Sequence, residues 1–122
     1  MLKKFYGIAL CVVFAATSFV AIQFAMFGST DVLGSVMGGA IVGLAIGIMC
    51  AVLDENPVST GIVTGMLLWL AELIYIVYFQ GVVLVGAYVI FAPILAAIIH
   101  GAISGLGYGF GSGKLRYSTH LD

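Results

Sequence analysis

Hydrophobic residues fill four long stretches of the chain, and short polar or glycine-containing segments separate them. Each stretch is long enough to cross a hydrocarbon core of about 30 Å as an α-helix, which rises about 1.5 Å per residue. The pattern therefore predicts a single-domain, all-α integral membrane protein. Its predicted transmembrane helices cover residues 5–27, 32–53, 57–79 and 82–107, with an interfacial tail over 108–122.

The separating segments carry recognisable turn and capping residues. Gly28 to Asp31 contains turn and N-cap residue types, and Gln80-Gly81 predicts a tight turn. Asn56 followed by Pro57 predicts an N-cap with proline at the first helical position. The third helix therefore has a well-marked start.

Composition and charge exclude other classes of protein. The chain is 63% hydrophobic and 7% charged, whereas charged residues make up about 25% of an ordinary soluble domain. Its few Lys and Arg residues do not form a basic surface for nucleic acid. The predicted surroundings are a lipid bilayer, together with copies of this chain or other membrane subunits as partners.

The positive charges are confined to the two ends of the chain. Lys3 and Lys4 precede the first predicted helix, and Lys114 and Arg116 follow the fourth. Basic residues flanking transmembrane helices are retained in the cytoplasm. We therefore predict that both termini are cytoplasmic, which agrees with an even number of spans.

Glycines recur at intervals of four in three of the predicted helices, a spacing that lets another helix approach closely in lipid. The predicted helix-packing residues are Gly34, Gly38, Gly39, Gly43, Gly47, Gly61, Gly65, Gly101 and Gly105. These faces can pack within one bundle or join separate subunits. Similar sequences at 39–47 and 101–109 are consistent with a duplicated helical hairpin, or with glycine-rich low complexity.

Glu72 is the candidate functional residue, because a carboxylate at bilayer depth is costly and normally faces a cavity, a bundle interior or a partner. Counting along the helices places Gln23, Tyr88 and Ser18 near the same depth. The same count places His100 about 27 Å from the start of the fourth helix. That position predicts a site near the cytoplasmic interface, without a direct contact to Glu72.

No other residue pattern indicates catalysis or a cofactor. Cys11 and Cys50 form no metal-binding motif, and Asp54-Glu55 is typical of a solvated turn. We therefore expect no catalytic, cofactor-binding or metal site. The expected function is a small non-enzymatic subunit of a larger or homo-oligomeric membrane complex. The alternative is a small ion- or proton-coupled transporter or channel that uses Glu72.

Overall fold

The structure, a computed structural model, describes residues 1–28, 31–81 and 87–114, without the side chains of Phe27, Ile76 and 87–90. The described residues form helices and no strand. The elements are α1 (Leu2–Phe27), α2 (Val32–Leu53), α3 (Pro57–Ile74), the π-helix η1 (Tyr75–Phe79) and α4 (Ala87–Ser112).

Within these residues, four helical segments are long and apolar enough to cross a membrane, so the all-α, multi-pass prediction is confirmed at that level. The segments are Leu2–Met26, Val32–Leu53, Pro57–Phe79 and Phe91–Ser112.

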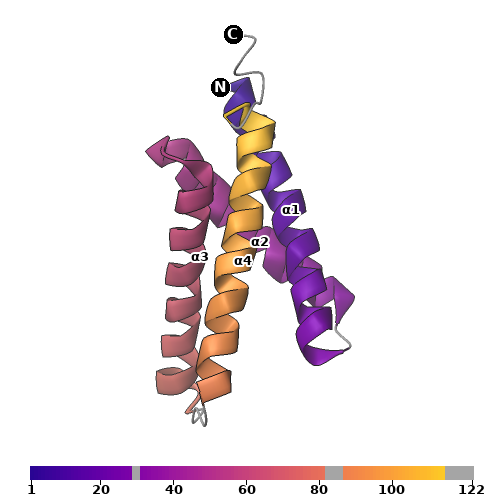
Figure 1. Ribbon diagram of the computed structural model, residues 1–122, viewed down its shortest axis with the longest axis vertical. Helices are drawn as coiled ribbons and strands as arrows, with labels where there is room; N and C mark the ends of the chain where they lie inside the picture. Colours follow the sequence, from indigo (N-terminus) through magenta and orange to yellow (C-terminus); the bar gives the residue numbers. More distant parts are fainter. Residues whose placement is uncertain (29–30, 82–86, 115–122) are drawn as a thin grey trace.

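Helix α4 lies between α3 and α1, and α2 crosses behind them (Figure 1). The main helix–helix interfaces are α1 with α4, α1 with α2, and α3 with α4. Met1, the connection over 54–56 and the last turn of α4 lie at one end of the bundle, called here the N-terminal end. Toward the opposite end, α1 diverges from α4 (Figure 1).

The start of α3 follows its local sequence. The Asn56 side-chain oxygen accepts hydrogen bonds from the backbone N–H groups of Val58 and Ser59, at 2.9 and 3.2 Å. Pro57 occupies the first turn, where its missing N–H costs nothing. The predicted N-cap is confirmed. The predicted helix to Phe79 is α-helical only to Ile74 and then widens into η1.

The end of α4 differs from the prediction. The predicted tail began at residue 108, but the helix continues to Ser112. Two of the glycines near its end pack on α1: Gly107 lies against Leu10 and Phe14, and Gly111 against Tyr6. Tyr108 is 1% exposed. Burial against α1 therefore keeps this glycine-rich segment helical. Residues 82–86 and 115–122, which the predicted spans and tail included, lie outside the described residues.

Several glycines stand where two helix backbones nearly touch. A methyl group added at Gly61 would overlap the carbonyl oxygen of Gly101, and one added at Gly105 would overlap that of Pro57. On the other side of the bundle, a Cβ at Gly43 would lie 3.0 Å from the Cα of Val12. The α3–α4 and α1–α2 pairs therefore approach at distances that a larger residue would not permit.

The remaining predicted packing glycines differ in their surroundings. Gly39, Gly47 and Gly65 also face a neighbouring helix closely. Around Gly38 the nearest contact is the edge of Phe19, 3.9 Å from an added Cβ, and Gly34 faces only Asp31 of its own first turn. Two of the five predicted packing glycines in α2, Gly34 and Gly38, therefore meet no neighbouring helix backbone closely among the described residues.

A small core closes the N-terminal end of the bundle. It consists of Cys11, Ile46, Cys50 and Tyr108, all buried. The Cys11 thiol donates a hydrogen bond to the Gly43 carbonyl oxygen at 3.2 Å. Both cysteines are free and act here as small buried side chains.

Candidate functional site

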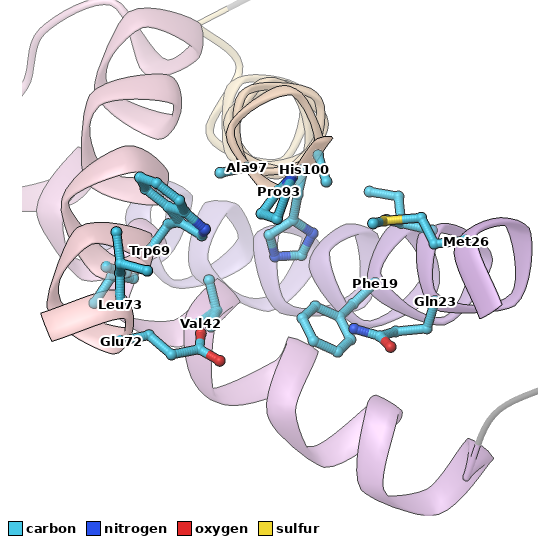
Figure 2. A pocket seen from close by; sticks show the side chains of 14 residues that line it. Phe19, Gln23, Met26, Val42, Trp69, Glu72, Leu73, Pro93, Ala97 and His100 are labelled. Carbon is cyan, nitrogen blue, oxygen red and sulfur yellow. The ribbon is translucent and has the colours of Figure 1, made fainter. Parts of the chain in front are cut away.

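A cavity of about 340 Å³ opens between the helices, away from the N-terminal core. We call it the interhelical cavity. All four helices contribute to its wall, which consists of Phe19, Ile22, Gln23, Met26, Val42, Gly65, Leu68, Trp69, Glu72, Leu73, Pro93, Ala96, Ala97 and His100. The wall is mainly apolar, with a few polar groups from separate helices (Figure 2). This combination is typical of sites that bind small molecules.

Helix α3 contributes the single carboxylate of the cavity. Gly65, Trp69 and Glu72 follow one another at helical spacing, so one face of α3 presents all three to the cavity. The close approach of Gly65 to the Ala97 carbonyl brings α3 against α4 beside them. Figure 2 shows the Glu72 carboxylate extending from α3 into the space before Val42. Glu72 is exposed, in contrast to the buried His100.

Helix α1 contributes an amide and an aromatic ring. Gln23 and Phe19 project into the cavity from the wall opposite α3 (Figure 2). The Cβ of Phe19 fits against Gly39 of α2, where the glycine leaves room for it. Glu72 and Gln23, which the sequence predicted at one depth, therefore line the same cavity.

Helix α4 contributes His100, which is 6% exposed. Its Nδ1 and the Ser18 hydroxyl oxygen are 2.8 Å apart in a hydrogen bond. Its ring meets the Phe19 ring edge-on, with centroids 5.5 Å apart. The Nε2 atom is buried and has no hydrogen-bond partner among the described residues. A buried nitrogen of this kind is costly to leave unsatisfied.

His100 lines the same cavity as Glu72. It lies near the middle of α4 and within the candidate membrane span Phe91–Ser112. Its predicted depth near the cytoplasmic interface stays a prediction. His100 and Glu72 share a cavity without a hydrogen bond between them, because Nδ1 binds Ser18 and Nε2 has no partner in the described part of the chain.

The other predicted residues have different positions. Ser18 stands behind the cavity wall, where it holds His100. The side chain of Tyr88 lies outside the described residues. Trp69 and His100 were absent from the predicted site. The spacing of Trp69 relative to Glu72 carried a signal for its position, since residues one turn apart share a helix face.

Fixed charges other than Glu72 lie away from the cavity. Lys114 donates from Nζ to the carbonyl oxygens of Asp54 and Glu55, and pairs with the Asp54 carboxylate at 2.9 Å. This hydrogen bond from Lys114 holds the pKa of the Asp54 carboxyl below its ordinary value. Lys4 donates to the Ala51 carbonyl oxygen at 2.9 Å. Both lysines therefore satisfy carbonyls at the end of α2.

Within the described residues, no group of three His, Cys, Asp or Glu side chains is placed to hold a metal ion. Comparison of the chain with protein-family models, with curated proteins and with solved structures gave no match. The cavity itself is therefore the basis for a functional proposal.

Proposed function

We propose that this chain is a small ion- or proton-coupled transporter or channel, with Glu72 as the group that binds the transported charge. One observation carries the proposal: α1, α3 and α4 bring Gln23, Glu72 and His100 to a single cavity within the membrane-spanning segments. Ionisable residues inside membrane helices are costly and usually serve a pathway or binding site. A carboxylate on a cavity wall fits that role better than one sealed between helices.

The distribution of charge supports a cationic substrate. Among the described residues, Glu72 is the single carboxylate on the wall, and no lysine or arginine lines the cavity. The described lysines lie on the first turn of α1 and after α4, at the N-terminal end. In surroundings of low polarity, an uncompensated carboxylate attracts a cation more strongly than it would in water. A proton, a metal cation and an organic cation all meet this requirement.

The bundle that holds the cavity is, in this proposal, assembled through its glycine faces. Backbone contact at Gly61, Gly101 and Gly43 supports this view, because close packing drives helix association in lipid. The positive-inside rule places both termini in the cytoplasm in this proposal.

A second candidate function is an accessory subunit of a larger or homo-oligomeric membrane assembly. The observation that favours it is the exposure of Glu72 together with neighbouring apolar side chains of α3, such as Leu70 and Ile74. A subunit packed against α3 would remove the carboxylate from lipid. In that case Glu72 anchors the interface, and its neutral isostere should preserve assembly without any change in transport.

The test uses proteoliposomes with pH- and sodium-sensitive dyes in the lumen and an imposed membrane potential. Glu72→Gln removes the charge at nearly constant shape, and Glu55→Gln is the matched control at an exposed acid outside the cavity. We expect protein-dependent flux that Glu72→Gln lowers by about tenfold or more, while Glu55→Gln preserves it. Equal flux from wild type and Glu72→Gln, at equal native mass, would overturn the proposal. Co-purification with unrelated membrane subunits would then favour the accessory role.

A further inference from the structure

The wall of the interhelical cavity has one kind of charge and two aromatic surfaces. Glu72 supplies a carboxylate, while Trp69 and Phe19 supply rings on either side of it (Figure 2). Aromatic faces attract cations through the negative charge of their π-systems, and tryptophan does so best. A carboxylate beside an indole therefore favours a positively charged ligand that also has an apolar part.

His100 and Ser18 share a buried hydrogen bond whose donor depends on the tautomer of the ring. The Ser18 hydroxyl donates to the Ala15 carbonyl oxygen at 3.1 Å. The same hydroxyl oxygen lies 2.8 Å from Nδ1 of His100. Nε2 is the ring nitrogen without a hydrogen-bond partner among the described residues. Figure 2 shows the imidazole extending from α4 toward the centre of the cavity, between Trp69 and Phe19.

The polar groups of the wall include one carboxylate. Glu72 accepts hydrogen bonds, the Gln23 amide both donates and accepts, and the Trp69 indole N–H donates. An anion would find no cationic donor here. Among the described residues, no group of three His, Cys, Asp or Glu side chains is placed to hold a metal ion. A ligand that carries several N–H donors on a positive charge matches this set.

We infer that the interhelical cavity binds an organic ammonium ion with an apolar body. The ammonium group pairs with Glu72, while the apolar body packs against Trp69 and Phe19. The cavity volume of about 340 Å³ is at the small end of the range for ligand pockets. This inference rests on the proposed function and names the substrate class of the same site.

Trp69 makes the inference directly measurable, because it is the only tryptophan in the chain and it lines the cavity. The protein is placed in lipid nanodiscs and titrated with 4-phenylbutylammonium while tryptophan fluorescence is recorded. The uncharged alcohol 4-phenylbutan-1-ol has the same apolar body and reports partition into lipid. Empty nanodiscs and the Glu55→Gln variant serve as controls.

We expect saturable quenching by the ammonium compound, with an affinity at least about tenfold above that of the alcohol. Glu72→Gln should remove this preference, whereas Glu55→Gln should retain it. Equal binding of both compounds, or a preference that survives Glu72→Gln, would overturn the inference. If the ammonium compound does not bind but proton or sodium flux still depends on Glu72, the substrate class is wrong and the proposed function stands. If neither binding of the ammonium compound nor Glu72-dependent flux is observed, the inference and the proposed function both fail.

Discussion

The two halves of this bundle are both mainly apolar, but one is closely packed and the other contains a cavity. At the N-terminal end, α1, α2 and α4 close around Cys11, Ile46 and Tyr108, with glycines allowing backbones to approach. Toward the opposite end α1 diverges from α4, and the interhelical cavity occupies the space between the helices. Buried polar groups of the closed half, such as the Ser104 hydroxyl, have hydrogen-bond partners. The open half holds a carboxylate and an imidazole with an unpartnered nitrogen.

The difference indicates where stability and function reside. Close backbone contact and complete burial stabilise the closed half, whereas polar groups in the open half are positioned at some cost. Substitutions in the first half should therefore change the free energy of unfolding. Substitutions in the open half should change ligand binding or flux more than they change the free energy of unfolding.

The largest loss of stability is expected where helix backbones touch. A Cβ at Gly101 would overlap the Gly61 carbonyl oxygen, so Gly101→Ala must separate α3 from α4. We expect a loss of about 1–3 kcal/mol in the free energy of unfolding, measured by titration with a denaturing detergent in mixed micelles. Gly38→Ala is the matched control, because the space around Gly38 is open. It should leave stability unchanged or raise it by about 0.5–1 kcal/mol. Equal losses from both would contradict the backbone contact.

A smaller loss of stability is expected at Ser18 and His100, where the closed half meets the interhelical cavity. Ser18→Ala removes the partner of His100 Nδ1 and leaves the buried ring with neither nitrogen satisfied. The expected cost is about 1–2 kcal/mol in the same unfolding titration. His100→Leu combined with Ser18→Ala should lose less than the sum of the single changes. Additive losses would show that the hydrogen bond does not couple the two residues.

The smallest loss of stability is expected at the exposed pair of Lys114 and Asp54. Because the pKa of Asp54 is lowered in the folded protein, its contribution is present above the ordinary carboxyl value of 3.8. It disappears as the pH falls through the lowered value. Unfolding titrations from neutral pH to below that range should show this loss, weakened by salt. Asp54→Asn should remove this component. An unchanged pH dependence in that variant would place the source elsewhere.

Much of the fold follows from local sequence. The four apolar stretches and the Asn56-Pro57 start of α3 predict helices at nearly the observed positions. The end of α4 did not follow, because Gly107 and Gly111 read locally as helix breakers while their contacts with α1 support the helix. These are tertiary contacts, and the sequence of one segment alone does not predict them.

The site was predictable only in part, for a related reason. Glu72 and Gln23 were placed together by depth alone, and they do line one cavity. The counting did not indicate that His100 lines the same cavity, because depth alone does not say which side chains face one another. The cavity itself arises from the divergence of α1 and α4, which is a property of the packed bundle (Figure 1). Depth along a helix can be estimated by counting residues, but the tilt of that helix relative to its neighbours cannot be read from the sequence.

The central claim is that Glu72 serves function more than folding. The most direct measurement compares wild type with Glu72→Gln in one preparation, recording native mass, unfolding in denaturing detergent, and cation flux in proteoliposomes. We predict the same mass, a change in stability within about 0.5 kcal/mol, and flux lowered by about tenfold or more. Loss of assembly together with unchanged flux per folded protein would contradict the claim, and would make Glu72 a structural anchor.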